Sequence, residues 1–218
     1  MEKYNKIIPF YGGANPEIFK IERRCMDRDG VVIEFLNNFL PKGKILDLGA
    51  GNGFTALRLQ TNNRIIIPVE PDEKMIDGSK KLLWVRGVAQ ELPFADSFFD
   101  GAYATWAFFF TGFKDSDRGL EELHRVVKDG GPDIIIDNAG NDEFSLYSER
   151  DIVSDPIWWK ERDFEVNILE TSYRFDSVEE GRKLMTFYFG DKGSNINKKE
   201  IEYKVAAYKK IITKKNFF

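Results

Sequence analysis

The sequence predicts an α/β fold in which a mostly parallel sheet is covered by helices on both faces. Three observations support this fold class. Short apolar runs that suit buried strands alternate with amphipathic segments from residue 44 to about residue 137. The first run, 44–48, leads into a glycine-rich turn, and the second run, 64–69, ends at the acid Glu70. Glycine and proline lie between the periodic segments, where turns are expected.

The chain has 218 residues, which is enough for one globular domain with a complete hydrophobic core. We therefore expect a single domain over residues 1–218. Its N-terminal region, residues 1–40, is expected to be helical, because apolar side chains recur at helical spacing over 15–28 and again over 29–40. Tyr11 and these helices could act as a lid over a site formed at the ends of the strands.

The most informative segment is the glycine-rich turn that follows the first strand. Asp47 is followed by Gly49, Gly51 and Gly53 at every second position. Glycine has no Cβ, so the backbone of such a turn can lie close to a bound ligand. The helix expected over 53–60 would direct its N-terminal N–H groups toward the same ligand.

Two classes of ligand use a turn of this kind. A nicotinamide site requires the spacing G-x-G-x-x-G, but its third glycine position is occupied here by Phe54. The observed spacing, D-x-G-x-G-x-G, resembles the first motif of the class I S-adenosylmethionine-dependent methyltransferases. In that family the turn lies against the amino-acid part of the cofactor, and the acid lies near the same group. The resemblance implies that the cofactor S-adenosyl-L-methionine is bound by Asp47, Gly49, Ala50, Gly51 and Gly53.

The second strand also ends at an acid. Glu70 lies 23 residues after Asp47, close to the roughly 20-residue offset of the ribose-binding acid in strand–helix–strand nucleotide sites. A carboxylate at this position can accept hydrogen bonds from both ribose hydroxyls, so we expect Glu70 and the adjacent Pro71 to bind the cofactor. The alternative is a solvated acid at the end of a strand. A helix is expected over 72–80.

A third motif begins at residue 87. The run Gly-Val-Ala-Gln-Glu-Leu-Pro-Phe resembles the G-D-A-x-x-L-P-F stretch of small-molecule methyltransferases related to ubiquinone and menaquinone biosynthesis. In that family the acid of the motif holds the adenine amino group, but here its position is Val88, which cannot form a hydrogen bond. Adenine contacts are therefore expected from the backbone near Ala89 and from Gln90. Ala104, farther along, completes the residues expected against the cofactor.

The last motif covers residues 121–131 and resembles the E-x-x-R-V-L-K-P-G-G signature that ends a helix before the fifth strand of the family. Asp129 replaces the usual proline. We expect the helix to cover 116–128, with the Gly130-Gly131 pair as a C-cap that needs positive φ. The four motifs span about 44–138, which we expect to be the cofactor-binding core.

Residues 139–218 are expected to complete the sheet. The run 164–173 is strand-like, and 201–207 alternates apolar with polar residues, which predicts a final strand. A helix is the alternative for that last segment, because Lys and Ala are good helix formers. Ser177, with an acid three residues later, indicates the start of another helix. The resemblance implies a Rossmann-like, doubly wound sheet of seven strands with an antiparallel C-terminal strand.

Methyl transfer from a sulfonium is an in-line displacement in which the protein supplies orientation and excludes water. Asp137, after the fifth strand, is the best candidate for a catalytic acid–base group; the alternative is that it caps the next turn. Tyr103 and Tyr11 are weaker candidates, and His124, the only histidine, is expected to be structural. No cluster has metal-ligand spacing, so no metal is expected. A Mg²⁺ site at Asp137 and Asn138 is conceivable.

The segment 102–110, expected after the fourth strand, is rich in aromatic residues. Ligands of parallel sheets bind beyond the carboxyl ends of the strands. This segment could form an apolar or aromatic acceptor pocket, or a cation–π wall for an amine; core packing is the alternative for Phe108–Phe110. The residues expected to line the pocket are Tyr11, Thr105, Trp106 and Phe109. The predicted function is methyl transfer to a small apolar or aromatic metabolite, and the alternative is a non-catalytic cofactor-binding or regulatory module.

The amino-acid composition limits the classes of molecule that the protein is expected to bind and the compartment in which it is expected to lie. The net charge of −4 disfavours nucleic acid as a substrate, because phosphate binding needs a basic surface. A single cysteine, Cys25, cannot form an internal disulfide, and a reducing, cytoplasmic location is the default expectation. No apolar run is long enough to cross a bilayer. The lysines near the C-terminus could bind RNA or an anionic membrane, but we prefer the interpretation that they protect an exposed or edge strand. They are Lys198, Lys199, Lys204, Lys209, Lys210, Lys214 and Lys215.

Overall fold

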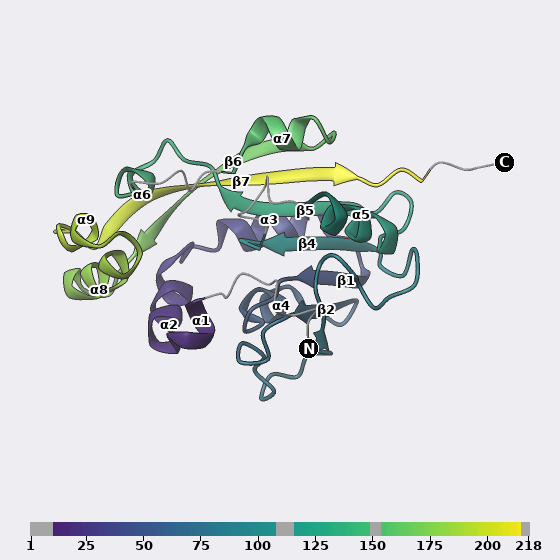
Figure 1. The fold of residues 1–218 in the computed structure, drawn as a ribbon, viewed down its shortest axis with the longest axis horizontal. Helices are drawn as coiled ribbons and strands as arrows, with labels where there is room; N and C mark the ends of the chain where they lie inside the picture. Colours follow the sequence, from purple (N-terminus) through teal and green to yellow (C-terminus); the bar gives the residue numbers. More distant parts are fainter. Residues whose placement is uncertain (1–10, 108–115, 149–153, 215–218) are drawn as a thin grey trace.

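The computed structural model describes residues 11–107, 116–148 and 154–214. Its strands form one seven-stranded sheet with the order β3-β2-β1-β4-β5-β7-β6 (Figure 1). Strands β1 to β5 are parallel, and β7 is antiparallel to both of its neighbours. The predicted doubly wound sheet with an antiparallel C-terminal strand is therefore confirmed. The strands are β1 Gly43–Leu48, β2 Arg64–Glu70, β3 Val85–Arg86, β4 Gly101–Thr105, β5 Pro132–Asn138, β6 Glu165–Arg174 and β7 Glu200–Ile211.

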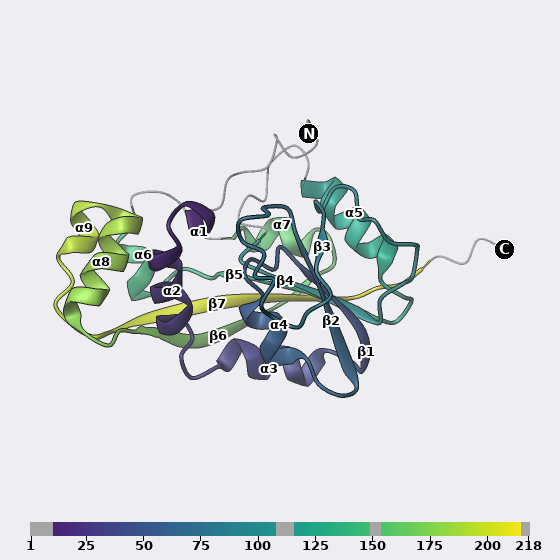
Figure 2. The same ribbon diagram turned by 90° about the horizontal axis from the view of Figure 1, so that it is seen from below.

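Helices cover both faces of this sheet. Helices α3 and α4 lie on one face and α5 and α7 on the other, which is clearest in Figure 2. Helices α1 and α2 lie near the edge where the parallel strands end (Figure 1). None of the helices in the described ranges combines the length and the apolarity needed to cross a bilayer. The helices are α1 Tyr11–Ala14, α2 Pro16–Cys25, α3 Val31–Phe39, α4 Phe54–Leu59, α5 Ser116–Val126, α6 Glu143–Leu146, α7 Pro156–Lys160, α8 Val178–Phe189 and α9 Asp191–Ser194.

The hydrophobic core has two parts, one on each face of the sheet. Successive side chains of a strand point to opposite faces, so Ile45 belongs to the part of the core that contains residues of α2, α3, α4 and α8, whereas Leu46 belongs to the part that contains residues of α5 and α7. In β5 the same alternation places Ile134 and Ile136 on the first face and Ile135 on the second. The two faces must be distinguished when the candidate site residues are located.

The N-terminal helices are fixed to the C-terminal half of the chain. Arg24 forms ion pairs with Glu180 and with Asp176, the latter at 3.1 Å. The thiol of Cys25 is buried and donates to Glu180 Oε1 at 3.1 Å, and burial raises the pKa of this thiol to about 12. Ser177 accepts the backbone N–H of Glu180, so the predicted start of α8 is confirmed. Helix α2 is thus held against α8 while its other side faces the ends of the strands.

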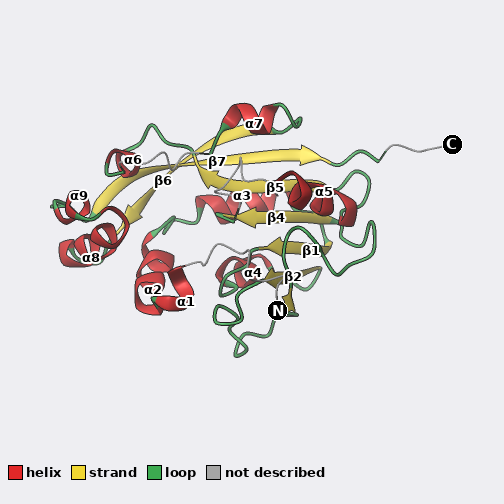
Figure 3. Cartoon of the chain, in the orientation of Figure 1, coloured by secondary structure: helices red, strands yellow, loops and turns green. Residues whose placement is uncertain are grey.

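Residues 72–80, which we expected to be helical, are instead turns and bends. Asp72 Oδ1 accepts the N–H of Lys74 at 3.0 Å, and Asp77 Oδ1 accepts the N–H of Ser79 at 3.1 Å. Such local side-chain bonds compete with the helical hydrogen-bond pattern. The predicted helix is wrong, and the chain between β2 and β4 is mostly loop, drawn green in Figure 3.

The end of α5 also differs from expectation. The helix ends at Val126, and Gly130, with φ of +77°, lies in the turn before β5 rather than at the helix cap. Its N–H donates to the carbonyl of Ile212 at 2.8 Å, which ties this turn to the chain after β7. His124 Nε2 lies 3.3 Å from the buried carboxylate of Asp133 at the start of β5. This contact between helix and sheet agrees with the structural role expected for the histidine.

The strand that carries the C-terminal lysines, β7, is not an edge strand, because it lies between β5 and β6. Lys209 Nζ is 3.7 Å from Glu165 Oε2, and Lys210 Nζ is 3.6 Å from Asp163 Oδ2. These lysines therefore pair with acids on or next to the neighbouring strand β6, which is the true edge of the sheet. Lys215 lies outside the described residues.

Candidate active site

The glycine-rich turn joins β1 to α4 at the carboxyl ends of the parallel strands. Gly49, Gly51 and Gly53 have φ values of +71°, +55° and +73°, in the region that side chains with a Cβ rarely adopt. The N–H groups of Gly49 and Ala50 donate to the carbonyl of Val69, at 2.9 and 3.1 Å, and so fix the turn on the end of β2.

The three glycines differ in what surrounds them. A Cβ on Gly49 would lie 2.5 Å from the Cβ of Ala107, and a Cβ on Gly53 would lie 2.7 Å from a methyl carbon of Leu82. Packing therefore excludes a side chain at Gly49, whereas one at Gly53 would displace the ends of the Leu82 and Trp84 side chains. At Gly51 the nearest atoms would be Met75 Cε at 3.6 Å and Phe19 Cζ at 3.7 Å, which are ordinary contact distances. The middle glycine has no such packing requirement, which makes it the position to test for a ligand.

Asp47 is fully buried in β1, beside Tyr103 of the adjacent strand β4. Among the described residues, no donor meets hydrogen-bond geometry with either carboxylate oxygen. Burial raises the pKa of this carboxyl to about 7, although the hydroxyl of Tyr103 lies close enough to act on the carboxyl and lowers its pKa in part. A buried carboxylate with so few donors is costly, so the arrangement has the charge and the free acceptors to bind a cationic group such as an ammonium. Tyr103 shares this burial, which raises the pKa of its phenol well above the usual value.

Glu70 at the end of β2 is buried and turned toward the glycine-rich turn. Its Oε2 accepts the N–H of Gly51 at 2.8 Å, and its Oε1 accepts the N–H of Asp72 at 2.9 Å. Burial raises the pKa of the carboxyl to about 7, although the two N–H groups act in the opposite direction. The alternative of a solvated acid is therefore wrong. Each oxygen accepts one described bond and has capacity for another, so a role toward ribose hydroxyls stays a prediction.

The structure shows the positions of the remaining residues that we expected to bind the cofactor, but fewer of their interactions point toward a ligand. Pro71 follows Glu70, and Ala89 and Gln90 lie in the turn after β3. The carbonyl of Gln90 accepts Arg118 Nε at 2.9 Å, which fixes this turn against α5. Ala104 lies inside β4 with its side chain in the core on the α5 face. A cofactor could meet Ala104 only through its backbone.

The expected acceptor segment begins within a strand. Residues up to Thr105 belong to β4 and do not follow it, which corrects the sequence-based boundary. Trp106 comes directly after the strand with a φ of +51°. Tyr11 is the first residue of α1, and Phe109 lies outside the described residues, as do Phe108 and Phe110.

A chain of hydrogen bonds holds Trp106 in place. Its Nε1–H donates to the hydroxyl of Tyr203 in β7 at 2.7 Å, and that hydroxyl donates to Asn138 Oδ1 at the end of β5. Burial raises the pKa of the Tyr203 phenol well above its usual range, so the hydroxyl stays protonated. Sequence reasoning missed Tyr203, which lies 97 residues from Trp106 in the chain. Only the apolar alternation of β7 marked it as an inward-facing residue.

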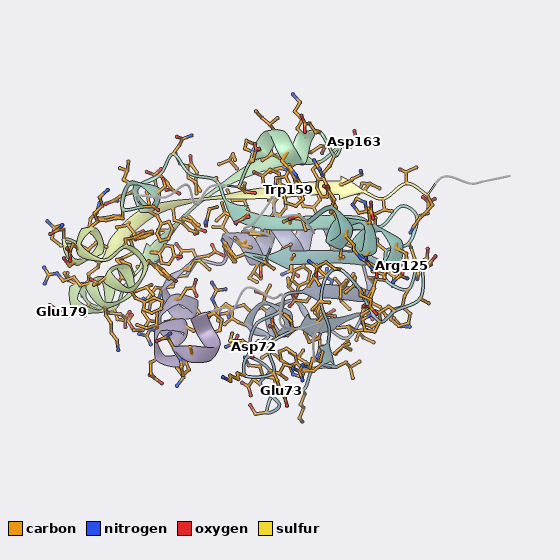
Figure 4. All side chains as sticks on the ribbon, in the orientation of Figure 1. Asp72, Glu73, Arg125, Trp159, Asp163 and Glu179 are labelled. Carbon is orange, nitrogen blue, oxygen red and sulfur yellow. The ribbon has the colours of Figure 1, made fainter. Side chains whose placement is uncertain are left out.

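Asp137 lies within β5, not after it, and is fully buried. Its Oδ1 accepts the N–H of Asn138 at 2.8 Å, which agrees with the capping alternative, and burial raises its pKa to about 7. Its side chain is on the face that holds Ser154 and Trp159, whose Nε1–H donates to the serine hydroxyl at 2.8 Å. Figure 4 labels Trp159 between α7 and the sheet.

Strand alternation therefore separates Asp137 from the Trp106 side of the sheet. The adjacent Asn138 points to the opposite face and contacts Tyr203, so the two neighbours cannot share a Mg²⁺ ion through their side chains. No group of three or more metal-binding side chains occurs among the described residues. A catalytic role for Asp137 remains a prediction that this geometry does not favour.

Comparison with known proteins identifies a match to a methyltransferase domain in this chain. Residues 46–135 match the family model described as a methyltransferase domain. The chain is 32% identical over 157 residues to a demethylmenaquinone methyltransferase of Bacteroides fragilis, covering 66% of this chain and 62% of that protein. It is 35% identical over 99 residues to a demethylmenaquinone methyltransferase of Streptomyces avermitilis, covering 44% of this chain and 42% of that protein. The chain thus spans less than two thirds of the length of these curated relatives.

Solved structures support the fold. The YcgJ protein of Bacillus subtilis superposes with a TM-score of 0.57 at 18% identity, covering 85% of this chain and 98% of that one. A protein of Thermotoga maritima, described as a SAM-dependent methyltransferase and possible histamine N-methyltransferase, gives a TM-score of 0.60 at 19% identity, covering 91% and 95%. The predicted resemblance to S-adenosylmethionine-dependent methyltransferases is confirmed, and so is the fold class.

Proposed function

We propose that this chain, which carries a methyltransferase domain over residues 46–135, binds S-adenosyl-L-methionine and catalyses transfer of its methyl group to a small molecule. The observation that carries the proposal is Asp47, a fully buried carboxylate to which no described donor bonds in hydrogen-bond geometry and which lies at the base of the glycine-rich turn. An ammonium is the kind of group that such a carboxylate lacks.

The residues at the turn fit a ligand that carries an ammonium and a ribose. Asp47 would hold the ammonium of the methionine part, and the backbone at Gly51 would lie beside the same part. Glu70 would offer its remaining lone pairs to the ribose hydroxyls while it fixes the turn through Gly51 and Asp72. When bound, the cofactor supplies a methyl group on a sulfonium, which is the reactive centre.

The acceptor we propose is a small aromatic or apolar metabolite. Trp106, held by Tyr203, offers a fixed aromatic surface just beyond β4, where ligands of parallel sheets bind. The curated relatives described above are, by name, methyltransferases of demethylmenaquinone, so a quinol-like ring is one acceptor of this class to test. The work of these residues is to orient the acceptor and to exclude water.

Calorimetry with S-adenosylhomocysteine is the first test, with NAD as the control ligand. We expect heat of binding and a higher melting temperature with S-adenosylhomocysteine and neither with NAD. Asp47→Asn should weaken the binding, because it removes the charge opposite the ammonium. Absence of heat and of a thermal shift at millimolar S-adenosylhomocysteine would refute the proposal.

A second measurement separates the enzyme from a non-catalytic cofactor-binding module. Quinols and phenols would be incubated with radiolabelled S-adenosylmethionine, and transfer of label would be followed with the wild type and Trp106→Ala. We expect Trp106→Ala to keep its affinity for S-adenosylhomocysteine and to lose transfer to any acceptor that the wild type methylates. Binding without transfer to any acceptor would favour the module.

A further inference from the structure

The turn at residues 88–91 begins beside Glu70 but is not part of a strand. Strand β3 ends at Arg86, which is the register partner of Glu70, and the N–H of Gly87 donates to the carbonyl of Glu70 at 3.4 Å. The next strand, β4, starts only at residue 101. The stretch 87–96 therefore lies outside the strands, although it contains the backbone that the sequence predicts to contact adenine.

Side chains of helix α5 hold this stretch in place. Arg118 Nε donates to the carbonyl of Gln90 at 2.9 Å, and Glu122 Oε2 accepts the N–H of Leu92 at 2.8 Å. Arg125, near the C-terminal end of the helix, also bonds to the stretch (Figure 4). Residues 118, 122 and 125 are three or four positions apart, so they lie on one face of the helix. We call Arg118, Glu122 and Arg125 the α5 clamp.

Arg125 binds two backbone carbonyls of the stretch. Its Nη2 donates to the carbonyl of Leu92 at 3.1 Å, and its Nη1 donates to that of Phe94 at 2.8 Å. Its Nε donates to Glu122 Oε1 at 2.6 Å, and its Nη1 lies 2.7 Å from Asp96 Oδ1. The bond from Arg125 lowers the pKa of Glu122, so this carboxylate is ionised at neutral pH. The two guanidinium groups of the clamp are matched by two carboxylates, so the clamp has no excess positive charge with which to bind an anion.

The clamp leaves two backbone donors of the turn open. The carbonyl of Val88 accepts the N–H of Glu91 at 3.2 Å, and the carbonyl of Gln90 is taken by the clamp. Within the described ranges, the N–H groups of Ala89 and Gln90 donate no backbone hydrogen bond. Adenine presents an acceptor nitrogen next to its amino group. Because the side chain of Val88 cannot hydrogen-bond, recognition of the base at this turn depends on the backbone.

We propose that the α5 clamp positions the turn at 88–91 for adenine binding, so that Arg118 and Glu122 determine the preference for an adenine base without contacting it. The inference rests on the proposed function. A side chain can adjust to a base by rotation about its own bonds, whereas a backbone N–H is directed only by the groups that fix its turn. A small misplacement of such a donor weakens its bond to the ligand. Arg118 and Glu122 are therefore positioning residues.

The test compares S-adenosylhomocysteine with S-inosylhomocysteine, in which an oxygen replaces the amino group of the base and the adjacent ring nitrogen becomes a donor. Calorimetry on the full chain would measure both ligands with the wild type, Glu122→Ala and Arg118→Met. Glu122→Gln keeps an acceptor for the N–H of Leu92, and Arg118→Lys keeps a donor for the carbonyl of Gln90. Melting temperature and circular dichroism of the variants without ligand would verify folding.

Lys128→Met is the matched control. Its Nζ lies 2.6 Å from Asp100 Oδ1, so the substitution also removes an ion pair next to α5. This pair includes no residue of the stretch 87–96. The control therefore accounts for a general loss of stability at this helix.

We expect the wild type to bind S-adenosylhomocysteine more tightly than S-inosylhomocysteine by about tenfold or more, because the changed base no longer accepts the N–H of the turn. In Glu122→Ala and Arg118→Met this ratio should fall to about threefold or less, through a loss of affinity for S-adenosylhomocysteine. Glu122→Gln and Arg118→Lys should restore most of the ratio, and Lys128→Met should keep it. A merely structural role would lower the melting temperature and leave the ratio unchanged.

The proposal is overturned if Glu122→Ala and Arg118→Met fold and keep the wild-type ratio, or if the wild type binds the two ligands equally. If Glu122→Ala does not fold, the exposed Arg118→Met decides by itself. A wild type that binds neither ligand refutes the proposed function and this inference with it. Variants that bind S-adenosylhomocysteine with an unchanged ratio refute this inference alone, so the two failures are distinguishable.

Discussion

Replacing Gly51 by alanine separates the binding role of the glycine-rich turn from its folding role. The residue has a φ of +55°, and the added Cβ would lie 3.6 Å from Met75 and 3.7 Å from Phe19, so the protein itself has room for it. The cost is then the backbone conformation alone, about 1–2 kcal/mol of unfolding free energy. For a domain of this size that corresponds to a melting temperature lower by about 2–8 °C.

Gly130→Ala is the matched control. Its φ is +77°, and nothing lies within 4 Å of an added Cβ. The strain should therefore be similar, but this glycine precedes β5, at the opposite end of the strands from the glycine-rich turn. We expect both variants to lose a similar amount of stability in urea unfolding.

Calorimetry then distinguishes the two glycines. Gly51→Ala should weaken binding of S-adenosylhomocysteine by about tenfold or more, because the methyl group would stand between the turn and the ligand. Gly130→Ala should bind as the wild type. If Gly51→Ala loses the expected stability but keeps its affinity, the turn is structural and its contact with the cofactor is refuted.

Three further predictions follow from buried polar groups. Because burial raises the pKa of Asp47 from 3.8 to about 7, its contribution to stability is present below pH 4 and lost as the pH rises through 7; urea unfolding of Asp47→Asn should show less of this loss. Tyr203→Phe should cost about 1–3 kcal/mol in urea unfolding, since it removes the hydroxyl that bonds both to the Trp106 N–H and to Asn138 Oδ1. Arg64→Met should cost about 3 kcal/mol or more in the same assay, because several buried carbonyls lose their donor.

Each of these predictions has a contradicting outcome. An unchanged pH profile in Asp47→Asn would show that the carboxyl titrates normally in the folded protein. Wild-type stability in Tyr203→Phe would mean that water or a rotated side chain replaces the hydroxyl. Wild-type stability in Arg64→Met would mean that the carbonyls at the ends of α3 and α4 reach solvent.

The parts of the site that sequence predicted best are those fixed by neighbouring residues. A strand that ends at an acid and continues into glycines with positive φ leaves few alternatives for the backbone, and Asp47, Gly51 and Glu70 meet at one place as expected. The helix over 72–80 failed for an equally local reason. Two aspartates there bond the backbone two residues ahead, and this competes with the helical pattern that the composition allowed.

Contacts between distant segments were not predictable in this way. The alternation of β7 showed which residues face inward, but it could not show that Tyr203 would meet Trp106. It also could not show whether the strand lies at the edge or inside the sheet. That depends on β6, which pairs with β7 along ten residues and takes the edge position itself.

Asp137 shows that a residue near the carboxyl end of a strand need not lie beside the candidate site. Ligands of parallel sheets collect beyond the carboxyl ends of the strands, and this favoured every polar residue near the end of β5. Adjacent residues of a strand point to opposite faces, however, so Asn138 joins the Trp106 and Tyr203 network while Asp137 joins Ser154 on the other face. The groups that hold Trp106 are thus a phenol kept protonated by burial and an amide, and neither is a base. In the proposed function this network would orient the acceptor, and any proton that the acceptor loses would leave by another route.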